Sequence, residues 1–491
     1  MRKMILVVFL LVTVLSLNSV YAADVNFDDY FVDKTMRIDL YHTGDSTTDI
    51  YSLDNVYTEG QWAGSVNNLV DYMNNGAYFV KVYDLDTNKM IFSRGFDSIF
   101  REYITTDDAI NGAKKTFSES VIMPYPKNKI KLAIERRDKK NEFDEVFSCV
   151  IDPSSTTIIK EERQEDVEVI DFQISGDNHK KVDLLFLAEG YTKDQRQKFI
   201  DDVNRLLKVF WAQAPYDKYK DSFNVRGVFL PSKDPGCDES SHGAFKRTSF
   251  NSGYDFFGSE RYLMTEDNKA MRNVAGTAPY DTLYMLVNQD RYGGGAIYNL
   301  YASTIVDNYW TDYVFLHEFG HSFAGLADEY YTSAVEYNDF YPKGYEPVEP
   351  NITALLDKDN VKWGNLCSSG IAVPSFWEKA EFDKMDLAYQ KKRQELNKKI
   401  AKMKREGAEA AEVEKYEQLS EKLSREHAVK VDDYLSGCAN YGKTGVFEGA
   451  GYCSKEMYRP ELDCIMFSKG AKPFCKVCRQ AVIERIKFYS E

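Results

Sequence analysis

Short runs of alternating apolar and polar residues fill the chain between residue 23 and about residue 168. Clear examples lie at 36–40, 78–83 and 130–134, and turn residues such as Asp86-Thr87-Asn88 separate them. Alternation with a period of two is typical of β-strands that bury one face. The pattern predicts an N-terminal all-β sandwich at 23–168, an accessory domain that packs on a second domain or holds substrate.

A different pattern begins after the charged stretch 160–168, which we interpret as a linker. Continuous apolar runs at 184–188, 223–230 and 282–287 predict buried strands, and residues 193–211 have helical spacing. Strands interleaved with helices predict an α/β sandwich. We expect this sandwich to end in the helix that carries the active site.

Residues 376–430 differ again, because they are rich in Lys, Glu and Ala. Apolar residues recur at helical spacing on both sides of Gly407, at Leu396, Ile400 and Met403 before it and at Tyr416, Leu419 and Leu423 after it. The pattern predicts an inserted antiparallel helical hairpin, which is either a solvated structural arm or an arm that docks protein substrates. We assign no role to His427 in this hairpin, and we expect the isolated His42 to lie on the surface.

The first 22 residues have the features of a signal peptide. Arg2 and Lys3 supply positive charge, Met4 to Leu17 form an apolar core too short to span a bilayer comfortably, and Val20-Tyr21-Ala22 ends in a cleavage site. We find no later stretch that is long and apolar enough to be a transmembrane segment after signal cleavage. We therefore expect an exported protein, located in the periplasm, at the cell surface or in the extracellular medium.

Eight cysteines in an exported chain raise the question of disulfides. Four of them, Cys453, Cys464, Cys475 and Cys478, cluster near the C-terminus. Three interpretations remain open for this group: disulfides, free buried thiols, and a second, structural zinc site. The spacing of the last two cysteines would also suit a redox pair, but no thioredoxin-like βαβ pattern surrounds them.

The strongest chemical signal in the chain is the segment HEFGHSFAGLADEY at 317–330. On a helix, His317 and His321 place their imidazoles on one face, about 6 Å apart, where they can bind one metal ion. Glu318 is placed to take a proton from a metal-activated water. A glycine can then end the helix, and Asp328 follows where zinc catalysis needs a third protein ligand. The competing interpretation, two ordinary helix histidines, leaves these flanking residues unexplained.

HExxH followed by a glycine turn and a third ligand resembles the metzincin clan of zinc peptidases. Three residues separate the second histidine from the glycine, and this variant is similar to the immunoglobulin A metallopeptidase family, the igazincins. Further segments that resemble this family are VDLLFLAEGYT at 182–192, GVFEGAGYCSKEMYRPELDCIM at 445–466 and FCKVC at 474–478. The resemblance covers about residues 180–375 and 430–490, with a weaker likeness in the N-terminal domain.

The resemblance implies one catalytic Zn²⁺ ion and the residues that hold it. The metal ligands would be His317, His321 and Asp328, and Glu318 would be the catalytic general base. Glu329, the next residue after Asp328, is a rival third ligand that could instead orient a histidine. We prefer Asp328, because it takes the ligand position of the family and its short side chain is easily held after a tight turn.

The resemblance implies two further features, the methionine turn and the edge strand, and two tyrosines near that methionine in sequence suggest a third. Met466 would form a structural turn beneath the metal. Tyr458, which we name as catalytic, or alternatively Tyr452, would donate a hydrogen bond to the oxyanion. The strand before the catalytic helix would be an edge strand, which we place at 296–303 after the glycines 293–295. Substrate would pair with this strand through main-chain hydrogen bonds.

We therefore expect a secreted zinc-dependent metalloendopeptidase with a metzincin-like α/β (α+β) catalytic domain at 169–491. The substrate would be a protein or peptide, and a host glycoprotein or an immunoglobulin is one candidate. A formal net charge of −15 argues against nucleic acid as a partner. The alternative is a catalytically degenerate peptidase fold that acts as an adhesin or as a binder of glycans or proteins. Against it, every expected catalytic residue is present.

Overall fold

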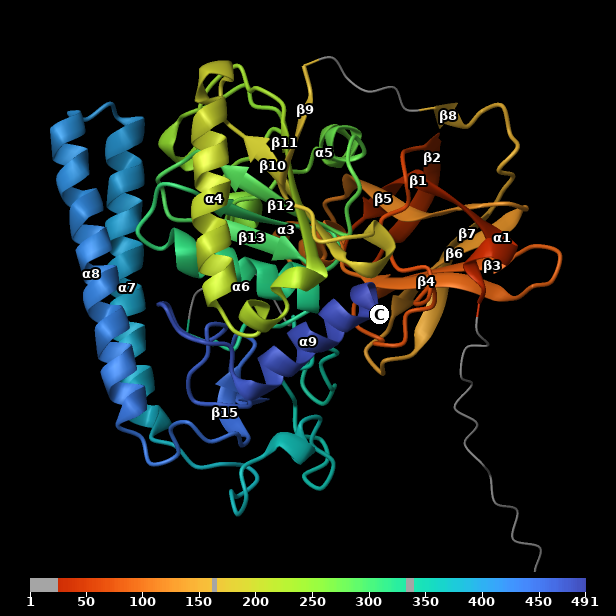
Figure 1. The fold of residues 1–491 in the computed structure, drawn as a ribbon. Helices are drawn as coiled ribbons and strands as arrows, with labels where there is room; N and C mark the ends of the chain where they lie inside the picture. The colour runs from red at the N-terminus through yellow and green to blue at the C-terminus, as the bar shows by residue number, and fades with distance from the viewer. Residues whose placement is uncertain (1–24, 161–165, 333–339) are drawn as a thin grey trace, which may run out of the picture.

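Strands prevail up to residue 173, and strands alternate with helices after it (Figure 1). The computed structural model describes residues 25–160, 166–332 and 340–491. The signal peptide that we predict at 1–22 and part of the predicted linker lie outside the described residues. Within the described ranges, we find no helix that combines the length and the apolar character needed to cross a membrane.

The N-terminal region contains two four-stranded sheets that share one hydrophobic core. Its strands are β1 (Phe31–Gly44), β2 (Asp49–Thr58), β3 (Tyr78–Asp84), β4 (Met90–Phe96), β5 (Lys115–Pro126), β6 (Ile130–Arg137), β7 (Phe143–Ile151) and β8 (Ile159–Lys160). The sheets have the orders β5-β1-β2-β8 and β4-β3-β6-β7. Neighbouring strands are antiparallel except β2 and β8. Alternate residues such as Val80 and Val82 enter the core, because successive side chains point to opposite faces of a strand.

Three short helices accompany these strands, so the region is not purely β. They are α1 (Phe27–Tyr30), α2 (Ile99–Tyr103) and α3 (Asp107–Ile110). Each follows a polar residue whose side chain accepts a hydrogen bond from a backbone N–H of the first turn, namely Asn26, Ser98 and Thr106. Such caps stabilise a single helical turn that is too short to produce a visible period of 3.6 residues.

His42 is fully buried on β1, and our expectation of a surface position is wrong. Its ring centroid lies 3.8 Å from those of both Tyr51 and Phe100. Nδ1 is 2.9 Å from Glu119 Oε1, and Nε2 is 2.8 Å from Asp49 Oδ1. The two carboxylates come from the neighbouring strands β2 and β5. A single histidine in an alternating strand does not indicate that such partners exist.

The second region is built on a six-stranded sheet of order β13-β14-β12-β10-β11-β9. Its strands are β9 (Glu168–Gln173), β10 (Val182–Glu189), β11 (Phe223–Phe229), β12 (Thr282–Val287), β13 (Gly294–Ile297) and β14 (Tyr301–Ile305). The four central strands are parallel, and β13 and β9 add antiparallel edges. The three apolar runs of the sequence correspond to β10, β11 and β12. Every residue of β10 and β12 is buried, as expected for strands covered on both faces.

The edge strand next to β14 is β13, at 294–297, and our placement of it at 296–303 is wrong. A turn occupies 298–300, and two glycines belong to the strand itself. A Cβ on Gly294 would lie 2.5 Å from Val314 Cγ1, and one on Gly295 would lie 2.5 Å from the Tyr262 ring. These glycines therefore serve close packing of the strand and not flexibility of a turn.

Helices cover both faces of this sheet (Figure 1). On one face, Leu184 and Phe186 pack with α4 (Arg196–Ala212), α6 (Thr311–Ala324) and α9 (Lys476–Ser490). On the other face, Leu185 and Leu187 share a core with α5 (Asn268–Ala275) and with α2 of the N-terminal region. The N-terminal region therefore contributes side chains to the core of the second region.

Two long antiparallel helices, α7 (Lys379–Arg405) and α8 (Ala410–Ser436), stand beside the sheet region (Figure 1). A turn that contains Gly407, with φ of 69°, joins them. His427 of α8 binds Asp386 of α7 at 2.5 Å and stacks on Tyr389, so it holds the two helices together. The hairpin β15 (Phe447–Ala450) and β16 (Cys453–Arg459) follows, and α9 ends the chain.

Polar contacts join the two regions along β1, β5 and α5. Arg37 on β1 is fully buried, pairs with Asp39 and Glu59, and donates a 2.7 Å hydrogen bond to Asn273. Asn268 donates a hydrogen bond of 2.8 Å to Ser120 on β5. A buried cation that binds partners in both regions favours one fixed arrangement, since separation would expose it and break its hydrogen bond to Asn273.

Candidate metal centre

Helix α6 carries the HExxH segment and is buried on almost every side. Phe315, Phe319 and Phe323 pack into the core under the sheet. The helix ends at Gly325, whose φ of 63° lies in the left-handed region that favours glycine. The glycine turn predicted from the sequence is therefore present, and it directs the following residues back toward the helix.

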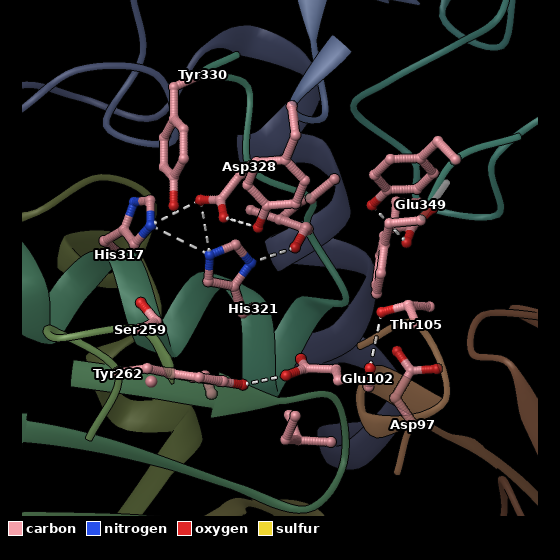
Figure 2. Close-up of a pocket in the computed structure, with 18 of the residues that line it drawn as sticks. Asp97, Glu102, Thr105, Ser259, Tyr262, His317, His321, Asp328, Tyr330 and Glu349 are labelled. Carbon is pink, nitrogen blue, oxygen red and sulfur yellow. Dashed lines mark hydrogen bonds and ion pairs between the residues drawn. The ribbon is translucent and has the colours of Figure 1, made fainter. Parts of the chain in front are cut away.

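The structure brings His317, His321 and Asp328 together (Figure 2). The two Nε2 atoms are 3.2 Å apart, and Asp328 Oδ1 lies 3.0 Å from His317 Nε2 and 3.2 Å from His321 Nε2. Bonds of about 2.0 to 2.2 Å to a tetrahedral zinc ion would separate such ligand atoms by about 3.3 Å. The three residues thus form a group that could hold a metal ion, and its dimensions fit zinc.

Backbone carbonyls orient both imidazoles. His317 Nδ1 lies 3.0 Å from the carbonyl oxygen of Ile465, and His321 Nδ1 lies 2.5 Å from that of Leu326. Because a carbonyl only accepts hydrogen bonds, each Nδ1 carries the proton and each Nε2 presents a lone pair to the shared point. This is the tautomer that metal binding requires.

The electrostatics of the group favour a positive charge at this point. Burial by itself would lower the pKa of His321, but the Asp328 carboxylate outweighs burial and raises that pKa to about 9. Burial likewise would raise the pKa of Asp328, but the two histidines hold it well below the ordinary value. A proton or a metal ion therefore neutralises the buried carboxylate, and the two compete for the same nitrogen atoms.

Glu318 projects from α6 into the cavity beside the histidines. Burial raises its pKa, although the neighbouring histidines act in the opposite direction. Gly294 of the edge strand makes room for it, since a Cβ at this glycine would lie 3.2 Å from Glu318 Cγ. The glutamate therefore stands between the ligand group and β13, where a bound peptide would pass.

A cavity of about 710 Å³ opens beside the ligand atoms. Edge strand β13 and helix α6 form one wall, and α7 and α8 contribute residues such as Arg393 and His427. Asp97 and Glu102 of the N-terminal region line it as well, and Tyr262 donates a 2.6 Å hydrogen bond to Glu102 across the boundary of the regions (Figure 2). Sequence reasoning missed these contributions, because the segments are far apart along the chain.

Several basic side chains line the same cavity, among them Arg261, Arg393 and Lys469. Arg261 donates a 3.1 Å hydrogen bond to the Tyr330 hydroxyl, and Lys469 Nζ lies 3.7 Å from the centroid of the Tyr292 ring. Burial lowers the pKa of Lys469 well below its ordinary range, and the two guanidinium groups lower it further. Arg393 Nε has no hydrogen-bond partner within the described ranges. The cavity lining thus carries charges of both signs, and Arg261 and Arg393 offer guanidinium groups to an anionic group of a ligand.

The tyrosine at the ligand group is Tyr452 and not Tyr458. The Tyr452 hydroxyl donates a hydrogen bond to Asp328 Oδ2. Tyr458 lies on β16, where its backbone pairs with Thr353, and it is not among the residues that line the cavity. Tyr330, which sequence reasoning missed, points its hydroxyl toward Asp328 (Figure 2). Its position at the end of the segment 317–330, two residues after Asp328, was the only available signal.

Met466 is fully buried beneath α6. Its Sδ lies 3.0 Å from the position that a Cβ on Gly320 would take, so the glycine between the two histidines permits this close approach. The Met466 carbonyl accepts a 2.9 Å hydrogen bond from the backbone N–H of Glu329. The turn that contains Met466 is therefore tied to the segment that carries Asp328.

Glu329 faces away from the histidines. Its carboxylate belongs to a different group, with Cys464, Cys475 and Cys478. The geometry thus places Asp328, and not Glu329, at the histidine pair. All eight cysteines lie in described parts of the chain, and all carry free thiols.

Comparison with known proteins agrees with this geometry. A family model described as IgA Peptidase M64 matches residues 170–486, and one described as Peptidase M64 N-terminus matches residues 26–148. A comparison with curated proteins gives no significant match. The two family matches together cover nearly the whole chain. The chain therefore belongs to the IgA Peptidase M64 family, which implies that it is a peptidase.

Proposed function

We propose that the protein is an exported zinc endopeptidase. The observation that carries this proposal is the convergence of two imidazole nitrogens and one carboxylate oxygen within 3.2 Å of one another. This group opens on a cavity that also contains a second carboxylate, that of Glu318. Three protein ligands and one open position are typical of catalytic zinc sites, whereas structural sites are closed by a fourth protein ligand.

His317, His321 and Asp328 would hold the ion, with the histidines oriented by the carbonyls of Ile465 and Leu326. When bound, zinc acts as a Lewis acid that acidifies water and polarises a scissile carbonyl. Glu318 accepts the proton of the attacking water and returns it to the leaving amine. Tyr452 and Tyr330 orient Asp328 or donate to the oxyanion, the role that we first assigned to Tyr458.

A substrate peptide would pair with the outer edge of β13. At Gly294 this edge is already covered, since Gly294 N–H donates to the Arg261 carbonyl and the Gly294 carbonyl accepts from Leu263, both at 3.2 Å. Backbone groups alternate along a strand, so those of Ala296 face the same side as those of Gly294. The peptide therefore has the Ala296 end of β13 available, which lines the cavity. Such pairing fixes an extended backbone and reads little of its sequence.

The finer architecture also belongs to this proposal. We assign residues 169–491 to a metzincin-type catalytic domain, with the hairpin at 376–430 as an insertion, and residues 23–168 to a β-sandwich accessory domain. Residues 1–22 would direct export to the periplasm, the cell surface or the medium. The family description contains the word IgA, and an immunoglobulin or another host glycoprotein is the first substrate to test.

Cleavage profiling of the mature protein on a mixed peptide library tests the function. We expect cleavage that a chelator abolishes and that added zinc restores. A degenerate peptidase fold that only binds its partners would instead leave the library intact while it retains stoichiometric metal. That result would overturn the proposal in favour of the binding protein.

A further inference from the structure

We propose that Glu329, Cys464, Cys475 and Cys478 form a second, structural zinc site beside the candidate catalytic centre. The four side chains each offer one ligand atom, and these atoms all lie within 4.8 Å of one another. Each residue is at most 3 % exposed. Four protein ligands close the coordination sphere, which distinguishes this group from the open histidine group.

The separations between these atoms match a tetrahedral metal site. Cys464 Sγ lies 3.9 Å from Cys478 Sγ, and Glu329 Oε1 lies 3.1 Å from Cys478 Sγ and 3.8 Å from Cys475 Sγ. Zn–S bonds of about 2.3 Å and Zn–O bonds of about 2.1 Å give tetrahedral edges of about 3.8 Å between two sulfurs and about 3.6 Å between sulfur and oxygen. The group is therefore close to the size that zinc requires.

A disulfide accounts for the cluster less well. A disulfide needs a sulfur–sulfur distance of about 2.05 Å, whereas Cys464 Sγ and Cys478 Sγ are 3.9 Å apart. It would also leave the third thiol and the Glu329 carboxylate without a function. Glu329 Oε2 is buried and has no hydrogen-bond partner in the described parts of the chain, which is costly for a carboxylate unless a cation is near.

Backbone N–H groups point at the sulfurs, as expected for thiolate ligands. Cys464 Sγ accepts from the N–H of Met466 at 3.5 Å and from that of Cys475 at 3.2 Å. Cys475 Sγ accepts from the N–H of Cys478 at 3.4 Å, because Cys475 is the N-cap of α9. The positive end of the helix dipole favours thiolate at that position. The buried Arg459 acts electrostatically on Glu329 and would offset part of the negative charge of the site.

The site would tie two segments that build the candidate catalytic centre to the start of α9. Glu329 directly follows Asp328, and Cys464 directly precedes Ile465, whose carbonyl orients His317. The other two cysteines begin α9. Zinc binding during folding would release the thiol protons to solvent and exchange them for metal–sulfur bonds. The ion would thereby hold the third-ligand segment and the Met466 turn against one helix end.

Metal analysis of the full chain and of two kinds of variant tests the inference. Zinc-loaded wild-type protein should contain two ions per chain, one for each group. His317→Ala, which leaves the cysteine cluster intact, should retain one ion. Substitution with cobalt should give a thiolate-to-cobalt charge-transfer absorption in wild type and in His317→Ala. Cys464→Ser should lose this absorption, and the matched control Cys149→Ser on β7 should keep it.

The His317→Ala protein keeps the test decisive even if Cys464→Ser fails to fold. A His317→Ala protein that folds but carries no metal would overturn the inference, as would cobalt-loaded protein without the charge-transfer band. Mass spectrometry after alkylation under denaturing conditions is an independent check. We expect all three cluster cysteines to be alkylated once zinc is removed, and a disulfide among them would overturn the structural zinc site. None of these outcomes decides whether the protein is a peptidase, because the proposed peptidase activity depends on the histidine group.

Discussion

Each histidine of the candidate metal centre is oriented by a backbone carbonyl from outside helix α6. Ile465 and Leu326 provide these carbonyls, and Tyr452 donates a hydrogen bond to the third ligand, Asp328. Ligand orientation of this kind raises metal affinity, because the side chains lose little freedom on binding. At the residue scale, Glu318 lies between the two histidines in sequence, and its carboxylate does not join the ligand group.

Substitution of Glu318 should separate metal binding from catalysis. In Glu318→Gln the three ligand atoms stay in place, so we expect unchanged metal content and a fall in kcat of about 10²- to 10⁴-fold. Metal analysis together with peptide turnover measures both. Asp312→Asn, an exposed change on the same helix, is the matched control and should keep wild-type turnover. Wild-type turnover in Glu318→Gln would contradict its assignment as the general base.

The buried His42 should make the free energy of unfolding depend on pH. Burial lowers the pKa of His42, but Glu119 and Asp49 outweigh burial and raise it above the ordinary 6.5. The folded state therefore binds the proton more tightly than the unfolded state, so this stabilisation is complete below pH 6.5. It is lost as the pH rises through the folded-state pKa. We expect the denaturant midpoint of the wild type to fall as the pH rises above 6.5 and through the folded-state pKa of His42, with a smaller fall in His42→Gln. Equal slopes in the two proteins would show that His42 does not carry the effect.

At the scale of elements, the hairpin of α7 and α8 is part of the cavity wall and more than a solvated arm. Asp386, Arg393 and His427 line the cavity. The His427–Asp386 contact fixes the two helices relative to each other. Edge strand β13 forms a facing part of the same cavity, so the hairpin lies where it can contact the side chains of a peptide bound to β13.

Arg393 is expected to select for acidic substrate residues. It lies in the cavity with Arg261, so a peptide carboxylate would find two guanidinium groups there. We expect Arg393→Ala to raise KM for peptides with acidic residues by about tenfold, because one charge-assisted hydrogen bond contributes about 1.5 kcal/mol. KM for neutral peptides should change little. Arg405→Ala, at the tip of the hairpin and outside the cavity lining, is the control. An equal effect on both peptide classes would argue against charge recognition.

The whole molecule depends on the contact between its two regions. The N-terminal region supplies α2 to the core beneath the sheet and supplies Asp97 and Glu102 to the cavity. Arg37 lies at the centre of this contact and is satisfied by carboxylates of its own region and by Asn273 of the other. The N-terminal region thus contributes to the shape of the cavity and packs against the second region.

Removal of Arg37 should destabilise the folded protein strongly. Arg37→Ala leaves Asp39 and Glu59 buried without their cation, so we expect a loss of about 3–5 kcal/mol in the free energy of unfolding. Denaturant unfolding measures it. Lys131→Ala, which breaks an exposed pair with Glu145 on the same region, should have little effect, because solvent screens that pair. Similar effects of the two substitutions would contradict a special role of the buried contact.

The sequence by itself determined features that depend on local spacing. HExxH on one helix, the glycine that ends it and the apolar runs of β10, β11 and β12 are properties of consecutive residues. Helical and strand geometry convert such spacing directly into direction in space. The membership in a peptidase family follows from the same continuous motifs.

Only the tertiary structure decided which distant residues meet. It distinguished Asp328 from Glu329, placed Tyr452 rather than Tyr458 at the ligands, buried His42 and moved the edge strand to 294–297. It also gathered Glu329 with three cysteines from the C-terminal part of the chain. The physical reason is that contacts between remote segments depend on how sheets and helices pack, and packing involves all of the side chains at once. The pattern within a single segment therefore does not show which distant segments it will contact.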